Sequence, residues 1–397
     1  MRRTRGLAPL ALALALVACE QRKPGEPAPA AGAAVQAGLP AGAPILLGHV
    51  ASLTGPEAAL GEATDKGLRL AVDEQNARGG VRGRQVVVRT ADDQGKQEEV
   101  SLLTTRLVVE DKVSVLLGEV ASRRSLAMAP IADKLLVPMV TPSSASPRVT
   151  MDGDKVRPYV FRVGLVDPGQ GTVMARFARE TLKLKRVAVL RDVGGDASVR
   201  LADAFLSRFK ELGGEVVDDQ SYRAGDADFK AQLAAIRRKK PEAVYVPGAH
   251  LEAALIARQA RDLGLAVPLL GGDGWDSPKL HEAARGALEG SYYSSLFSAQ
   301  DPSPRVAAFV KRYQARYGAA PDSLAAHGYD AAQVTMEAMG RAPDLSRNAI
   351  RDALAATRAF PGVTGDITIG SDHNSAKPVA LLKVQGEQAV FQQAVLP

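Results

Sequence analysis

VSVLLGEVASRRSLAMAP, residues 113–130, shows in one stretch the pattern that decides the fold. A short run of aliphatic residues is followed at once by a longer amphipathic segment that begins at Ser122. Such pairs of segments predict a parallel sheet with crossover helices. Because the same alternation continues along the chain from Pro44, we predict the α/β fold class.

Two sets of predicted strands follow one another along the chain. The first set covers residues 45–52, 85–93, 113–120, 138–142 and 159–164, and the second covers 186–193, 215–222, 243–249, 268–274 and 291–297. The repeated layout predicts two doubly wound parallel-sheet lobes, and 397 residues exceed the roughly 250–300 at which a single core stops growing.

The segments after residue 300 decide how the lobes are connected. Residues 304–318, 323–342 and 347–357 are predicted helices without strands between them, so we expect them to return to the first lobe. The last strands, at 378–386 and 389–396, should return to the second lobe. We therefore assign residues 44–164 and 299–370 to the first lobe and 165–298 and 371–397 to the second. The resulting hinge has three crossings, near residues 164, 298 and 370.

The N-terminal residues have the pattern of an export signal. The basic stretch MRRTRG precedes the apolar run LAPLALALALVA, which is too short to span a membrane and stops at Cys19, the only cysteine. The pattern resembles bacterial lipoprotein signals, in which cleavage before the cysteine is coupled to acylation of its thiol. We expect residues 1–18 to be a signal peptide and Cys19 to be lipidated. The alternative is a plain secretory signal that is cut near a buried cysteine, and either interpretation predicts export.

Residues 20–43 join this signal to the folded body. Alanine, glycine and proline make up 16 of these 24 residues, so there is almost nothing to bury in a core. We therefore expect residues 19–43 to form the lipidated cysteine and a tether. The membrane would be contacted through this lipid anchor only.

Composition and motifs exclude several functional classes. The chain is 46% hydrophobic and 24% charged, as in a soluble globular protein. Its net charge of +6, half of it from Arg2, Arg3 and Arg5, is too small to indicate nucleic-acid binding. The segment HEAAR, residues 281–285, has Arg285 where a zinc protease needs its second histidine. No nucleotide-binding or nucleophile motif follows a strand, so we expect no catalytic residues, metal or cofactor.

An ordered series of sequence blocks resembles one family. The blocks include LTGP, LAVDEQNARGGVRGRQVVV, VSVLLGEVASRRSLAMAP, PMVTPSSASPRVT, VFRVGLVDPGQG, GAHLEAALIARQARDLGL, GGDGWDSPKL and YDAA. Their succession is similar to the periplasmic leucine/isoleucine/valine-binding protein family, which are type I solute-binding proteins of ABC importers. The resemblance runs from about residue 45 to 396 and implies two lobes that close on a ligand. It does not specify the ligand, because members that bind amino acids, amides, urea and aromatic acids share these blocks.

The first lobe should supply a carboxylate-binding half of the site. A ligand of an open α/β sheet lies beyond the carboxyl ends of the strands, and Ser122 follows such a strand where a helix begins. Its hydroxyl and the positive helix end could hold a carboxylate, or Ser122 could be only a helix cap. The resemblance adds the backbone at Ser143 and the side chain at Ala145. Alanine lacks a hydroxyl, so Ser144 or Ser146 would have to supply the donor.

The second lobe should supply the group that pairs with an ammonium. Asp273 follows a strand between glycines, and by resemblance it takes the place of the acid that binds the α-ammonium of a ligand. The alternative is that Asp273 caps the helix near Pro278 or braces its own loop. We expect Trp275, the only tryptophan, to line the cleft, with burial in the core as the alternative.

The expected pocket walls differ from those of amino-acid-binding relatives. Where the relatives have aromatic side chains, this chain has Leu60, Ala197 and Ala249, and Asp196 is the alternative alignment for Ala197. Loss of aromatic walls would enlarge the cleft, so a ligand larger or more apolar than leucine is expected alongside branched-chain amino acids. His250 could fill part of this space or lie in solvent.

The resemblance implies a solute-binding lipoprotein, expected as a monomer, that serves an ABC permease and ATPase complex in the periplasm. The alternative is a sensory ectodomain that reports its ligand to a receptor, because such modules share the fold. A neighbouring permease gene or receptor gene would distinguish the two.

Overall fold

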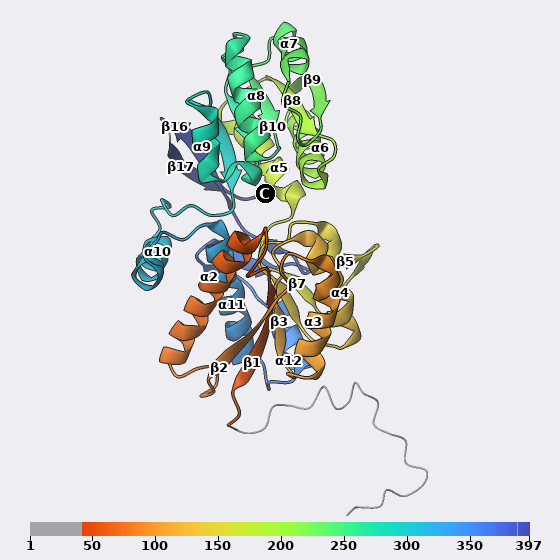
Figure 1. Cartoon of the computed structure of the whole chain (residues 1–397), viewed down its shortest axis with the longest axis vertical. Helices are drawn as coiled ribbons and strands as arrows, with labels where there is room; N and C mark the ends of the chain where they lie inside the picture. The colour runs from red at the N-terminus through yellow and green to blue at the C-terminus, as the bar shows by residue number, and fades with distance from the viewer. Residues whose placement is uncertain (1–41, 387) are drawn as a thin grey trace, which may run out of the picture.

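The computed structural model describes residues 42–386 and 388–397, which form two lobes joined by three segments. Figure 1 shows one lobe above the other. The predicted signal peptide, Cys19 and nearly all of the tether lie outside the described residues. Within the described part, no helix is both long and apolar enough to cross a membrane.

The first lobe is built on a parallel sheet of five strands in the order β2-β1-β3-β4-β7. The strands are β1 (Ile45–Ala51), β2 (Val86–Asp92), β3 (Val115–Leu117), β4 (Met139–Thr141) and β7 (Val160–Arg162). All five coincide with strands that the sequence predicts. The runs are aliphatic because both faces of a parallel sheet are covered by helices.

Helices cover both faces of this sheet. The helices are α2 (Ala58–Ala77), α3 (Gln97–Val109), α4 (Ser122–Lys134), α11 (Ser323–Arg341) and α12 (Arg347–Ala355). α2, α11 and α12 share one hydrophobic core with the sheet, and α3 and α4 share the core on the opposite face. Glycines let α2 and α11 approach closely: a Cβ at Gly67 would lie only 1.8 Å from the carbonyl oxygen of Ala325.

The second lobe has a sheet of seven strands in the order β17-β16-β12-β11-β10-β8-β9. Five run parallel, namely β8 (Arg186–Asp192), β9 (Glu215–Tyr222), β10 (Ala243–Val246), β11 (Leu269–Gly271) and β12 (Tyr292–Ser295). The C-terminal strands β16 (Val379–Gln385) and β17 (Gln388–Val395) extend this sheet in antiparallel fashion, as the sequence predicts.

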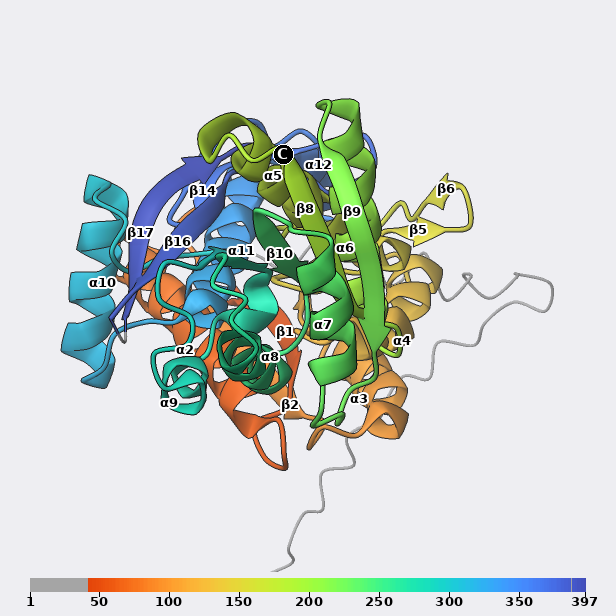
Figure 2. The same ribbon diagram turned by 90° about the horizontal axis from the view of Figure 1, so that it is seen from above.

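Helices also cover both faces of the second sheet. They are α5 (Asp167–Arg176), α6 (Asp196–Glu211), α7 (Lys230–Arg238), α8 (His250–Asp262) and α9 (Pro278–Ala284). A π-helical turn, Phe177–Thr181, continues α5. α5 and α6 share one core with the sheet, and α7, α8 and α9 share the other. Figure 2, which looks down on this lobe, shows α5 and α8 on opposite sides of the strands.

Smaller elements complete the structure. A hairpin of β5 (Met151–Asp152) and β6 (Lys155–Val156) follows the 3₁₀ turn Pro147–Val149. The helix α10 (Pro304–Tyr317) packs beside the first lobe and precedes α11. A three-stranded sheet is formed by β13 (Phe360–Gly362), β14 (Gly365–Ile369) and β15 (Ser375–Ala376). The sequence analysis does not anticipate these short strands.

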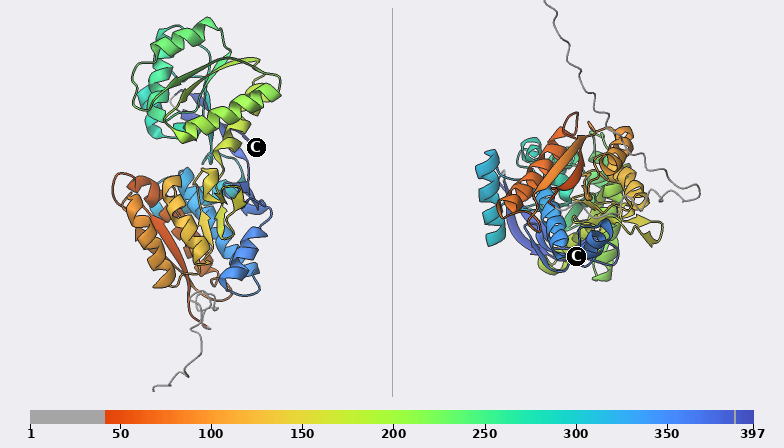
Figure 3. Two further views of the ribbon diagram at one scale, coloured as in Figure 1. Left: turned by 90° about the vertical axis from the view of Figure 1, so that its right-hand side faces the viewer. Right: turned by 90° about the horizontal axis from the view of Figure 1, so that it is seen from below.

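The chain crosses between the lobes after β7, after β12 and after β15. The segments lie close together near the C-terminus (Figure 3, left). The third crossing lies at Lys377 and Pro378 rather than near residue 370. The shift arises because β15 pairs with β14, and the Ser375 hydroxyl donates hydrogen bonds to the carbonyl oxygens of Val163 and Gly164, both at 2.7 Å.

Candidate functional site

The carboxyl ends of the parallel strands in the two lobes are directed to the region between them (Figure 1). In the first lobe, Ser122 is the first residue of α4 and follows the loop that leaves β3. Ala121 occupies the cap position, so Ser122 is not the helix cap. The Ser122 hydroxyl accepts a hydrogen bond from the Ser146 N–H at 3.1 Å, which brings together two loops that sequence analysis assigns to the site.

The backbone carbonyl of Glu119 fixes both of these loops. It accepts hydrogen bonds from the hydroxyls of Ser125 at 2.8 Å, Thr141 at 3.0 Å and Ser144 at 2.8 Å. Ser144, one of the two serines predicted as a ligand donor, has a buried hydroxyl that already bonds the backbone of the neighbouring loop. The structure instead gives Ser144 a positioning role.

Ser143 and Ala145 lie in the same loop as Ser144. The Ser143 hydroxyl oxygen is buried without a hydrogen-bond partner among the described residues, and Ala145 is half-buried. A buried hydroxyl without a partner is unfavourable by about 1–3 kcal/mol. Ser143 thus has a hydroxyl that bonds no other group among the described residues.

A buried arginine joins the loops at this edge of the first sheet. Arg124 Nε lies 3.0 Å from the Glu119 carboxylate and 3.4 Å from that of Asp93, and its Nη2 lies 2.7 Å from Glu57. Burial raises the pKa of Glu119, while hydrogen bonds from Arg124 and from the Ala121 N–H oppose that rise. Glu57, Asp93 and Glu119 follow β1, β2 and β3, so a single guanidinium holds three adjacent loops in place.

In the second lobe, Asp273 begins a 3₁₀ turn directly beyond β11 and is half-buried. Burial raises the pKa of Asp273 to about 6, and the nearby carboxylates of Asp167 and Asp276 add to this rise. The amide of Gln170 acts in the opposite direction. Asp273 does not cap α9, because the Ser277 hydroxyl accepts the capping hydrogen bond from the Lys279 N–H.

Asp167 lies close to Asp273 but is already paired. Its Oδ2 accepts hydrogen bonds from Nε and Nη2 of Arg200, at 2.9 and 2.7 Å. Asp273 forms no salt bridge among the described residues. A carboxylate of this kind is suited to pair with a cationic group of a solute.

The expectation that Trp275 lines the cleft is wrong. Its side chain is 0% exposed and belongs to the core of the second lobe, and Nε1 donates a hydrogen bond to the carbonyl oxygen of Val246 at 3.0 Å. The 3₁₀ turn directs the indole back against Gly271, where a Cβ would lie 2.2 Å from the ring. The glycine therefore makes room for the tryptophan rather than for a ligand.

The three expected wall positions are all open to solvent. Leu60 is 42% exposed in the first turn of α2. Ala197 is exposed in the first turn of α6, and so is Asp196, the alternative alignment. Ala249 is exposed at the cap of α8, which begins with the half-buried His250. These positions lie beyond the carboxyl ends of β1, β8 and β10, so the topology places them at the edges that carry Ser122 and Asp273.

A cavity of about 330 Å³ adjoins Leu60 and has walls from both lobes. Its lining includes Leu60 and Leu324 from the first lobe and Asp276, Tyr293 and Leu382 from the second, with Phe297 from the crossing after β12. The sequence analysis missed Tyr293, Phe297 and Leu324. Aromatic side chains therefore lie near Leu60, but they come from β12 and the crossing after it rather than from the predicted wall positions.

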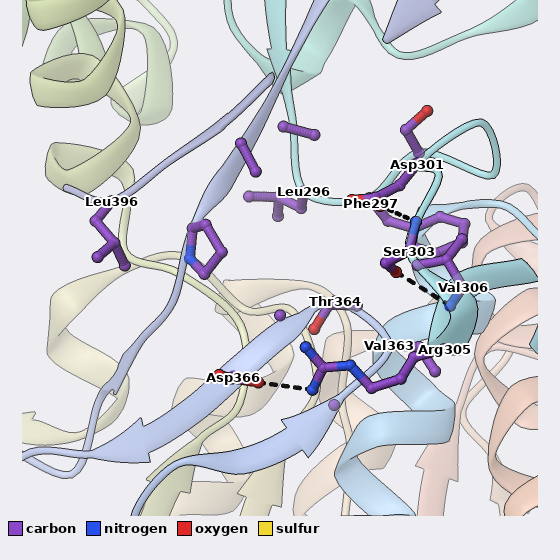
Figure 4. Close-up of a pocket in the computed structure, with 16 residues that line it drawn as sticks. Leu296, Phe297, Asp301, Ser303, Arg305, Val306, Val363, Thr364, Asp366 and Leu396 are labelled. Atoms are coloured by element: carbon purple, nitrogen blue, oxygen red, sulfur yellow. Dashed lines mark hydrogen bonds and ion pairs between the residues drawn. The ribbon is translucent and has the colours of Figure 1, made fainter. Parts of the chain in front are cut away.

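A second cavity, of about 310 Å³, lies at the hinge (Figure 4). Phe297 and Pro378, from two of the crossings, line it together with residues of both lobes. Arg305 Nη1 donates a hydrogen bond to Asp366 Oδ1 at 2.6 Å at this cavity, as Figure 4 shows. Because both lobes form the walls, a change in the angle between the lobes must change the shape of this cavity.

Comparisons with known proteins agree with this architecture. A family described as "Periplasmic binding protein" matches residues 44–389. The chain is 31% identical over 332 residues to the Leu/Ile/Val-binding protein BraC3 of Rhizobium johnstonii, which covers 83% of this chain and 88% of that protein.

Solved structures extend the match to the whole folded body. A leucine binding protein LivK from Thermotoga maritima is 37% identical with a TM-score of 0.76, and the alignment covers 89% of this chain and 99% of that one. The branched-chain amino acid substrate binding protein LivJ of Streptococcus pneumoniae, solved in complex with isoleucine, is 33% identical with a TM-score of 0.76. That alignment covers 89% of this chain and 100% of the other.

Proposed function

The chain belongs to the periplasmic binding protein family, and on this premise we propose that it captures a small solute between its lobes and delivers it to an ABC importer. The family consists of solute-binding proteins rather than enzymes. The observation that carries the proposal is the placement of Ser122 and Asp273 beyond the carboxyl ends of strands in opposite lobes. A solute that contacts both residues would hold the lobes together.

An amino acid fits the chemistry of these two residues. The Ser122 hydroxyl and the start of α4 suit a carboxylate, because free backbone N–H groups and the helix dipole favour negative charge there. Asp273, which forms no salt bridge within the described part of the chain, suits an ammonium. Relatives described as leucine- and isoleucine-binding proteins support this class of solute.

The side chain of the solute would lie toward Leu60 and the cavity beside it. This cavity, about 330 Å³, offers apolar contacts from Tyr293, Phe297 and Leu324 beside the carboxylates of Asp276 and Asp322. Ala197 and Ala249 have small side chains, which leave further room for the solute at the edge of the second lobe. We therefore include solutes larger than leucine, such as aromatic amino acids and other carboxylates or amides.

The location we propose is the periplasm, with lipidated Cys19 as the membrane anchor and residues 20–43 as the tether. The expected partners are a permease and its ATPase.

A thermal-shift screen followed by calorimetry tests the proposed function. The solutes would be branched-chain and aromatic amino acids, their amides, and aromatic and fatty acids. A solute at 100 times its Kd should stabilise the fold by about 2.7 kcal/mol. Small-angle scattering of the same complex should show a smaller radius of gyration. A saturating solute that leaves the scattering curve unchanged would contradict capture by lobe closure.

A further inference from the structure

Arg162 is a buried guanidinium that forms no salt bridge with a carboxylate in residues 42–386 and 388–397. It is the last residue of β7 and pairs in register with Thr141 of β4, two residues before Ser143. Its side chain is 0% exposed, and it forms no salt bridge among the described residues. Buried charges in proteins are ordinarily paired, so this arginine requires an explanation.

In the described part of the chain, one arm of this guanidinium has a hydrogen-bond partner and the rest has none. Nη2 donates a hydrogen bond to the carbonyl oxygen of Ser146 at 2.5 Å, while Nε and Nη1 have no partner among the described residues. The N–H of Ser146 donates to the Ser122 hydroxyl. The guanidinium is therefore linked through a single residue to the hydroxyl that we assign to the solute carboxylate.

The nearest acids attract this charge without forming a salt bridge with it among the described residues. Asp167 attracts Arg162 but accepts both of its side-chain hydrogen bonds from Arg200. Asp372 also attracts Arg162, but its carboxylate bonds Asn374. Although burial lowers the pKa of Arg162 to about 10, the group stays ionised at neutral pH. The loop of residues 143–146 therefore lies over a positive charge that these two carboxylates attract but that forms no salt bridge among the described residues.

We propose that Arg162 is a specificity-determining residue that favours an anionic group of the solute at Ser122 and the loop of residues 143–146. The proposal rests on the proposed function and refines it, because it requires the first-lobe end of the solute to be a carboxylate rather than an amide or hydroxyl. The charge of Arg162 adds to the positive end of α4. It also offsets the missing hydroxyl at Ala145.

The test is a thermodynamic cycle in which both the residue at position 162 and the charge of the solute are changed. Leucine is compared with leucinamide, and phenylacetate with phenylacetamide, in wild-type protein and in the Arg162→Met and Arg162→Lys variants. We expect wild-type protein to prefer each carboxylate over its amide by at least tenfold. In Arg162→Met this preference should fall by about tenfold, and Arg162→Lys, which keeps the charge, should recover most of it.

A matched control separates this effect from a loss of packing. Arg347 is also buried and donates to backbone carbonyl oxygens, at 2.6 Å to Val113, and its Nη1 has no hydrogen-bond partner among the described residues. It contacts the chain just before β3, at the amino end of the sheet and away from the candidate site. Arg347→Met should lower stability without changing the carboxylate preference.

The possible outcomes distinguish the two proposals. If Arg162→Met weakens a carboxylate and its amide by the same factor, Arg162 only supports the loop and the inference is overturned. If Arg162→Met does not fold, Arg162→Gln replaces it. A carboxylate preference that is unchanged in Arg162→Lys and reduced in Arg162→Gln supports the charge effect. An unchanged carboxylate preference in Arg162→Gln overturns the inference. If wild-type protein binds none of the four solutes nor any other in the screen, the proposed function itself fails.

Discussion

Lys377 Nζ donates a hydrogen bond to Nε2 of His327, 2.8 Å away, and both side chains are completely buried. The same Nζ donates to the Thr364 hydroxyl at 2.7 Å, which in turn donates to Asp330 Oδ2 at 2.6 Å. His327 Nδ1 lies 2.7 Å from the carbonyl oxygen of Ser323, so this nitrogen carries the proton and Nε2 accepts. Lys377 thereby anchors the third crossing to α11.

This cluster predicts that stability increases with pH. Burial lowers the pKa of Lys377 to about 7, against the attraction of Asp330. The unfolded chain holds the proton up to about pH 10.4, so between about pH 7 and 10 it binds more protons than the fold. The free energy of unfolding is therefore highest above about pH 10 and decreases as the pH falls toward 7. Burial and the charge of Lys377 lower the pKa of His327. Below about pH 6.5, His327 therefore also makes the stability of the fold increase with pH.

Urea unfolding of the Lys377→Met variant between pH 7.5 and 9.5 tests this prediction. The slope of the unfolding free energy with pH should decrease by up to about 1.4 kcal/mol per pH unit, the value for one proton. Lys311→Met on the exposed face of α10 serves as the control and should leave the slope unchanged. An equal slope in wild-type protein and Lys377→Met would refute the assignment.

The two serines of the first-lobe site should respond differently to mutation. Ser144→Ala removes a buried hydrogen bond to the Glu119 carbonyl, so we expect a loss of about 1 kcal/mol of unfolding free energy. Ser122→Ala should weaken a carboxylate solute by about 1.5–3 kcal/mol, because the lost hydrogen bond is to a charged group. Calorimetry and urea unfolding of both variants measure the two effects. A Ser144→Ala variant of normal stability that no longer binds would show that Ser144 contacts the solute after all.

Much of the architecture follows from local sequence patterns. The strand predicted at 186–193 is observed as β8, Arg186–Asp192, because an apolar run between two amphipathic helices has few alternatives in an α/β fold. The strands β13 to β15 were missed because they are two to five residues long and are stabilised by pairing with each other and with the first crossing. Such short strands have no periodic pattern to detect.

The site was less predictable because its contacts are between distant residues. Whether the Ser144 hydroxyl faces the solute or the protein depends on the Glu119 carbonyl, 25 residues earlier in the chain. The burial of Trp275 depends on the room left by Gly271 and on the acceptor at Val246. The lack of a salt bridge at Arg162 within the described residues depends on Arg200, which engages Asp167. Nothing in a single sequence indicates these relationships.

Cys19 should carry the membrane anchor. It is the only cysteine, it ends the signal-like run, and a tether without apolar core residues follows it. The Cys19→Ala variant, expressed from the full chain, should appear in the soluble fraction with its solute affinity unchanged. Fractionation without detergent measures the distribution. If the variant stays with the membrane pellet, the lipoprotein interpretation is wrong.

The charge of Asp273 should make the binding of an amino acid depend on pH. Its pKa of about 6 means that the carboxyl group becomes protonated as the pH falls through 6, and an ammonium pairs only with the ionised form. The affinity should therefore be constant near pH 8 and decrease below pH 6, approaching tenfold per pH unit.

Asp273→Asn keeps the shape of the side chain and removes the charge, so it should weaken the binding of an amino acid by about 2–5 kcal/mol, or roughly 30-fold or more, at pH 8. It should also abolish the decrease below pH 6. Calorimetry with leucine at pH 5, 6, 7 and 8 measures both effects. Equal affinities of wild-type protein and Asp273→Asn would mean that the solute has no ammonium at this position, which would favour a carboxylate without an amino group as the natural ligand.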